Sequence, residues 1–197
     1  YRCLSPRRPL RYAASDKTEW EDAVADSAMP TINHVGMTVT DLDKALAWYQ
    51  EVLGFTVLTQ PVEMATDDPI LGESLADMLG PRVRRFRMAH LQTGNRVGIQ
   101  VYEFLDPKPE QAPAEVPYWR TGFSHICVTH NDIEELAARI EAHGGTRSRV
   151  WAVLKDKPYA AAYCADPFGN VIEINSHGYE ETRTFLMEDG DAAGGAY

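Results

Sequence analysis

The chain has 197 residues, of which 44% are hydrophobic and 24% are charged, as in one globular domain or two small fused modules. Its formal net charge of −10 argues against nucleic acid and anionic membranes as partners, because both repel an acidic surface. No apolar run approaches the roughly 18 residues of a membrane-spanning helix. Three cysteines without a CxxC pair do not suggest a disulfide framework, and they indicate a reducing, cytoplasmic compartment.

Residues 1–29 are expected to lie outside the folded domain as a disordered or transit-like segment. The first fourteen residues contain four arginines and no acidic residue, which fits the remnant of an organellar transit peptide. A disordered basic tail is the alternative. The transit interpretation would place the protein in a mitochondrion or another organelle.

The first predicted module, residues 31–105, begins with a strand at 31–39 that is rich in β-branched residues. Asp41 has the chemistry of a helix N-cap, apolar residues then recur at helical spacing, and Gly54 closes the helix. Pro61 and the other loop residues predict a loop after the next strand. The later elements of this module are strands at 55–59, 84–91 and 97–104, and a short helix at 72–79.

Residues 106–118 contain four prolines and are predicted to link two halves of the chain. The same order of elements then recurs in a second module, residues 119–176. Residues 179–197 are predicted to form an acidic C-terminal tail. The elements expected in the second module are a strand at 123–129, a helix capped by Asp132 and closed by Gly144–Gly145, strands at 146–150 and 159–164, and a last strand after the turn Asp166–Asn170.

An internal repeat defines the architecture. A shift of 91 residues places His34 on His125 without a gap over the first strand and helix of each module. Matching the last strands instead places Gln100 opposite Glu173. The predicted fold class is therefore α+β, with the unit strand-helix-strand-strand-strand used twice.

Strand alternation gives four polar side chains a common position in the two modules. Ile172 and Ile174 share the face that packs on the helix, which leaves Glu173 on the other face. Two imidazoles, one amide oxygen and one carboxylate suit a divalent metal such as Zn, Ni, Co, Mn or Fe, with positions open for substrate. The predicted metal ligands are His34, Gln100, His125 and Glu173.

Each of these residues has a simpler interpretation when it is taken alone. A strand histidine is usually a core or surface residue, and a buried glutamate is usually part of a salt bridge. The recurrence of histidine at the same place in both modules favours the metal site. Glu103 is a rival to Gln100 as the fourth ligand, although alternation groups it with Ile99 and Val101.

With these motifs together, the chain resembles the vicinal oxygen chelate superfamily, which includes glyoxalase I, bleomycin resistance proteins and extradiol dioxygenases. The resemblance covers about residues 31–176. It implies two βαβββ modules that form a cupped mixed sheet around a divalent metal held by the four residues named above. The motifs that carry it are His34-Val35-Gly36, Asp41-Leu42, the run from Trp48 to Phe55, and Asp166 to Glu173.

The resemblance implies a lyase or isomerase that acts on a small substrate with two neighbouring oxygens through an enediolate, as in glyoxalase I or methylmalonyl-CoA epimerase. Glu173 would be both a metal ligand and the catalytic base. The His-Gln-His-Glu set is closer to the epimerases, whereas Ser124 before His125 departs from their pattern. The alternatives are an Fe(II) extradiol-type dioxygenase that uses His34, His125 and Glu173, and a non-enzymatic binder of a small molecule such as an antibiotic.

The remaining expectations concern the substrate and the assembly. The family resemblance implies a homodimer, and the partner of the site is a small molecule. The residues expected to contact that substrate are Tyr102, His90, Phe123 and Tyr163.

Overall fold

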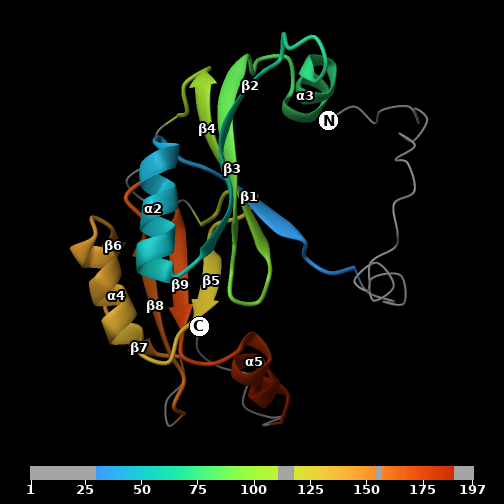
Figure 1. Ribbon diagram of the computed structural model, residues 1–197. Helices are drawn as coiled ribbons and strands as arrows, with labels where there is room; N and C mark the ends of the chain where they lie inside the picture. The colour runs from blue at the N-terminus through green and yellow to red at the C-terminus, as the bar shows by residue number, and fades with distance from the viewer. Residues whose placement is uncertain (1–29, 111–117, 154–156, 189–197) are drawn as a thin grey trace. The chain divides into compact units, whose positions relative to one another are not determined.

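The computed structural model describes residues 30–110, 118–153 and 157–188 (Figure 1). The whole of the predicted segment 1–29, seven residues of the linker and the end of the acidic tail therefore lie outside the described residues. The elements below belong to one compact unit that begins at His34. No helix in the described ranges is long and apolar enough to cross a membrane.

The first module forms a four-stranded sheet with the strand order β1-β4-β3-β2. β1 runs parallel to β4, and the other neighbours are antiparallel. β1 and β2 therefore lie at the edges of this sheet. The elements in chain order are β1 (His34–Thr38), α2 (Leu42–Leu53), β2 (Thr56–Ala65), α3 (Gly72–Leu79), β3 (Arg85–Gln92) and β4 (Gly98–Asp106).

The second module repeats this topology in a sheet with the order β5-β9-β8-β6, in which β7 also pairs with β8. β5 is parallel to β9, as β1 is to β4. Two mixed sheets and few helices confirm the predicted α+β class. The elements are β5 (Ile126–Thr129), α4 (Ile133–Ala142), β6 (Thr146–Arg147), β7 (Trp151–Ala152), β8 (Ala160–Ala165) and β9 (Val171–Asn175), followed by α5 (Tyr179–Glu188).

The two main helices begin as the sequence predicts. Asp41 Oδ1 accepts a hydrogen bond from Lys44 N at 3.1 Å, and Asp132 Oδ1 accepts one from Glu135 N at 2.9 Å. Each cap satisfies a backbone N–H that the helix leaves without a partner, which contributes about 1 kcal/mol. Gly54 ends α2 in the left-handed region, with φ at 70°, where glycine carries no steric penalty.

Both modules contribute to one hydrophobic core. Ile99 of β4 and Ile172 of β9 are buried in it, so the intervening side chains of these strands face the other side of each sheet. The modules are also joined by hydrogen bonds: Tyr49 Oη donates to Asp166 Oδ2 at 2.7 Å, and Trp48 Nε1 donates to the His143 carbonyl at 3.0 Å. Burial raises the pKa of Tyr49 well above its usual value, so its phenol stays protonated.

The predicted loop after the second strand begins too early. β2 continues to Ala65 and contains Pro61, although the prediction ended this strand at residue 59. β2 is an edge strand, and its register with β3 shifts between Thr59 and Val62. A proline is tolerated there because an edge or a bulge does not need its missing N–H.

Two other boundaries also differ from the prediction. The strand expected at 123–129 begins at Ile126, so His125 lies just before β5. The expected acidic tail begins as α5, which has two acidic residues, Glu180 and Glu181, in its first turn. Negative side chains stabilise a helix N-terminus, and Thr182 Oγ1, in a residue that is 2% exposed, donates a hydrogen bond to the Tyr179 carbonyl in the same turn.

Gly145 occupies a place where no side chain fits. A Cβ atom there would meet the Ala165 carbonyl oxygen and would lie 2.6 Å from Ile140 Cγ2. We therefore expect Gly145→Ala to lower the free energy of unfolding by about 1–3 kcal/mol, measured by urea denaturation. Gly94→Ala is the matched control, because a Cβ atom added at Gly94 would meet no atom within 4 Å from the described residues beyond its two chain neighbours. Equal stability of the two variants would contradict this close approach.

Candidate functional site

The carboxylate of Glu173 lies in a strand whose five residues are all buried. Glu173 itself is only 9% exposed, so its charge requires a partner. Its Oε2 atom lies 2.9 Å from His125 Nε2. The parallel pairing of β5 with β9 brings the two together, because Cys127, two residues after His125, is the Cα partner of Glu173.

Neighbouring side chains form hydrogen bonds with both His125 and Glu173. Asn175 Nδ2 donates to Glu173 Oε1 at 3.2 Å and to Cys127 Sγ at 3.0 Å. On the other side, Ser124 Oγ lies 2.9 Å from His125 Nδ1. These contacts orient the imidazole and the carboxylate in the way that outer partners orient metal ligands. Burial raises the pKa of Cys127, which keeps its thiol protonated.

Aromatic rings line one side of the pair. Tyr163 is the Cα partner of Glu173 across β8 and β9, and its ring meets that of His125 edge-on at 5.3 Å between centroids. Trp151 stacks on Tyr163 at 5.4 Å, and Tyr118 lies at 5.9 Å. Burial, and then the charge of Glu173, raise the pKa of Tyr163 to about 12. Its phenol therefore remains a neutral hydrogen-bond donor at physiological pH.

The first module has the same register with different side chains. Gly36, two residues after His34, is the Cα partner of Gln100, and His90 pairs with Gln100 from the other side. His34, Gln100 and His90 thus correspond to His125, Glu173 and Tyr163. Gln100 Nε2 lies 3.5 Å from His90 Nε2 and 3.0 Å from Met88 Sδ.

Glu103 occupies a different environment from Gln100. Its Oε2 atom accepts hydrogen bonds from Arg87 Nη1 at 2.9 Å and from Leu42 N, at the start of α2, at 3.3 Å. Glu103 lies three positions after Gln100, so the two point to opposite faces of β4. This carboxylate binds the N-terminus of α2 and Arg87, so it is engaged on the face of β4 away from Gln100.

The other expected substrate contacts are distributed unevenly. Tyr102 is on the same face as Gln100 and stacks on Phe104 at 5.7 Å, and burial raises its pKa. Phe123 is fully exposed, two residues before His125. Tyr163 contacts the His125–Glu173 pair, and His90 contacts Gln100.

The four predicted ligands thus lie on two sheets, with His125 and Glu173 in direct contact. Among the described residues, no group of three or more His, Cys, Asp or Glu side chains is placed to hold a metal ion. The pair nevertheless has suitable donor chemistry, since an imidazole nitrogen and a carboxylate oxygen meet at one point and both are held from outside. It fits one half of a divalent-metal site.

Sequence reasoning overlooked Asn175 and Cys127. Strand alternation could have found both, because each lies two residues beyond a predicted ligand and therefore shares its face. Tyr118 and Trp151 gave no such signal, since they approach Tyr163 from a loop and from a two-residue strand.

The class defined by this fold is that of two repeated βαβββ modules with a histidine and an acid or amide at equivalent positions. The family model for the Glyoxalase/Bleomycin resistance protein/Dioxygenase superfamily matches residues 31–174. The chain belongs to this superfamily.

Two relatives with assigned activities share about a quarter of their aligned residues with this chain. An epimerase of 2-epi-5-epi-valiolone from Actinomyces sp is 25% identical over 147 residues, which are 73% of this chain and 77% of that protein. A lactoylglutathione lyase from Arabidopsis thaliana is 24% identical over 167 residues and 84% of this chain. The match spans about half (49%) of the Arabidopsis protein.

Solved structures support the fold. A glyoxalase family protein from Bacillus cereus has a TM-score of 0.60 at 21% identity, and the match covers 77% of this chain and 96% of that one. At 21% identity this similarity shows the fold, and the reaction has to be inferred from the residues of the site.

Proposed function

We propose that this protein is a divalent-metal-dependent lyase or isomerase that acts on a small substrate with two neighbouring oxygens. The observation that carries the proposal is the buried Glu173 carboxylate in contact with His125 Nε2 at 2.9 Å. A relative named as an epimerase and one named as a lactoylglutathione lyase agree with this reaction class. Glyoxalase I and methylmalonyl-CoA epimerase are the two reaction types we favour.

In this proposal the metal is bound by His125 and Glu173 of the second module. The first module, of the same chain or of a second copy, contributes His34 and Gln100. A bound divalent metal supplies Lewis-acid stabilisation of negative charge on a substrate oxygen. The protein's own groups do the rest: Glu173 moves the proton as catalytic base, and Asn175 holds the second oxygen of that carboxylate in place.

The aromatic residues have a supporting role in the same proposal. Tyr163 stays protonated and can donate a hydrogen bond toward the carboxylate or a substrate oxygen. Trp151 and Tyr118 pack around Tyr163 and reduce the access of water on that side. Lower water content strengthens the electrostatic interactions of a carboxylate base with its partners.

A metal-reconstitution screen tests the reaction. Protein stripped with a chelator is loaded in turn with Zn, Ni, Co, Mn and Fe(II), and assayed with methylglyoxal plus glutathione, with an epimerisable acyl-CoA and with a catechol. We expect about one metal per site and turnover of one of the first two substrates. Oxygen consumption with the catechol would instead identify a dioxygenase. A protein that stays metal-free and indifferent to chelator would overturn the proposal in favour of a binder.

We further infer that the protein is a homodimer in which a second copy completes each site. The candidate ligands are divided between two sheets, and His34 begins the edge strand β1 while His125 directly precedes the edge strand β5. Edge strands can pair with another chain. Large apolar side chains are also exposed just before His125, at Trp119 and Phe123, as in a surface that a partner covers.

Mixing two inactive variants tests this shared arrangement. His34→Ala inactivates the first-module half of a site, and Glu173→Gln inactivates the second-module half. If sites are shared, refolding an equal mixture gives mixed dimers with one intact site each, and about one quarter of wild-type activity returns. Each variant refolded alone is the control. Absence of recovery in mixed dimers isolated with two different affinity tags would show that each site belongs to one chain.

A further inference from the structure

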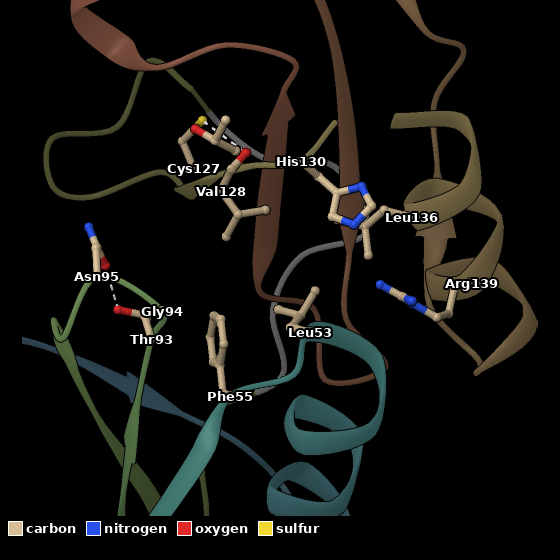
Figure 2. Close-up of a pocket in the computed structure, with 11 residues that line it drawn as sticks. Leu53, Phe55, Thr93, Gly94, Asn95, Cys127, Val128, His130, Leu136 and Arg139 are labelled. Atoms are coloured by element: carbon tan, nitrogen blue, oxygen red, sulfur yellow. Dashed lines mark hydrogen bonds between the residues drawn. The ribbon is translucent and has the colours of Figure 1, made fainter. Parts of the chain in front are cut away.

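A cavity of about 460 Å³ lies between the two modules (Figure 2). Leu53 and Phe55, at the end of α2, line it from the first module, and Val128 and Leu136 line it from the second. Figure 2 shows Leu53 and Phe55 on one side and Cys127 with Val128 opposite. The volume is in the range of small-molecule sites, which are about 300–1,000 Å³.

Arg139 is the one charged side chain among the described residues that line this cavity, and it is a cation. Arg139 of α4 and His130, which follows β5, lie on the same side of it in Figure 2. Asn95 lies on the facing side, in the turn between β3 and β4. No aspartate or glutamate is among the described residues that line it. On a chain with a formal net charge of −10, such a lining favours an anion.

The polar groups are arranged as donors. Thr93 Oγ1 donates to Asn95 Oδ1 at 2.6 Å, which leaves the Asn95 amide nitrogen as a donor. Arg139 Nη1 pairs with Glu135 Oε1 at 3.2 Å, and within the described chain Arg139 Nε is buried without a hydrogen-bond partner. The guanidinium therefore retains hydrogen-bonding capacity beside the cavity, and a carboxylate is the group that matches its geometry.

We propose that this cavity binds a small organic anion, a carboxylate attached to one ring or a short alkyl chain. The apolar body packs among Leu53, Phe55 and Leu136, and the carboxylate faces Arg139. The ligand thus contacts both modules at once. This site is separate from the proposed reaction, but it adjoins the His125–Glu173 pair through Cys127, which lines the cavity and is the Cα partner of Glu173.

Calorimetric titration with 4-phenylbutyrate tests the site, using chelator-treated protein so that metal binding plays no part. We expect saturable one-to-one binding, and about 10- to 100-fold weaker binding of the uncharged 4-phenylbutyramide. Arg139→Gln should weaken 4-phenylbutyrate binding by a similar factor. Arg85→Gln is the matched control, since Arg85 forms an exposed pair with Glu63 on the first sheet, and it should bind as wild type does.

A second measurement locates the ligand. Cys127 lines the cavity, so 4-phenylbutyrate should slow its alkylation by N-ethylmaleimide at least several-fold, as followed by mass spectrometry of the peptide that contains it. The proposal is overturned by absence of saturable binding, by equal affinity for the amide, or by binding that Arg139→Gln leaves intact. Binding without protection of Cys127 would place the anion elsewhere and also overturn it.

Discussion

Replacing Glu173 by glutamine is expected to lower kcat/KM by about 10³-fold or more, because one change removes a metal ligand and the proposed base. Glutamine has nearly the same shape, so the hydrogen bond from Asn175 to Oε1 can persist and the fold should be retained. The measurement is steady-state kinetics on metal-reconstituted protein, with metal content determined on the same samples.

Glu103→Gln is the matched control for that experiment. Glu103 is also a partly buried glutamate on a last strand, but it binds Arg87 and the N-terminus of α2. Its change should cost stability and leave kcat/KM within a few-fold of wild type. Full activity of Glu173→Gln would show that Glu173 is not the base. Loss of the metal from Glu103→Gln, with metal retained in Glu173→Gln, would show that Glu103 is the metal ligand.

Asp166→Ala is expected to lower the free energy of unfolding by about 3–5 kcal/mol. Asp166 is 3% exposed and opens the turn before β9. Its Oδ1 atom accepts hydrogen bonds from the backbone N–H groups of Phe168, at 2.9 Å, and Asn170, at 2.7 Å, while Oδ2 accepts the Tyr49 hydroxyl. The alanine leaves two partly buried N–H groups and the buried Tyr49 hydroxyl without this acceptor, and it removes a link between the modules.

Urea denaturation measures the effect, and two variants calibrate it. Tyr49→Phe removes one of the same hydrogen bonds and should cost about 1–2 kcal/mol. Asp132→Ala removes a helix cap at an exposed site and should cost about 1 kcal/mol. If Asp166→Ala costs no more than Asp132→Ala, the turn does not depend on that carboxylate and the contact with Tyr49 is dispensable.

The repeat, and the face of each strand on which a side chain lies, could be predicted from the sequence because both depend on local rules. Helix caps at Asp41 and Asp132 are set by a single side chain and the turn that follows it. Alternation along β4 and β9 then placed Gln100 and Glu173 on corresponding faces, and the two strand registers agree with that pairing. Rules of this kind need no knowledge of how the modules pack.

The features that sequence reasoning missed depend on tertiary context. A proline usually ends a strand. β2 continues past Pro61 because it is an edge strand and its register with β3 shifts there. α5 begins inside the segment expected to be an acidic tail, and Thr182 within it is 2% exposed. The cavity beside Arg139 combines a helix end, a hairpin turn and an edge strand, and no spacing in the sequence connects these three.

The matching registers of the two modules have a consequence for the proposed centre. Equivalent ladder positions hold a neutral amide, Gln100, in one module and an anionic carboxylate, Glu173, in the other. Two neutral imidazoles add no charge, so a divalent cation among these four donors would keep one unit of positive charge. That surplus would attract an anionic substrate oxygen and hold back its protonation. The two modules thus share a strand register at these positions, but only the second module contributes a negative charge there.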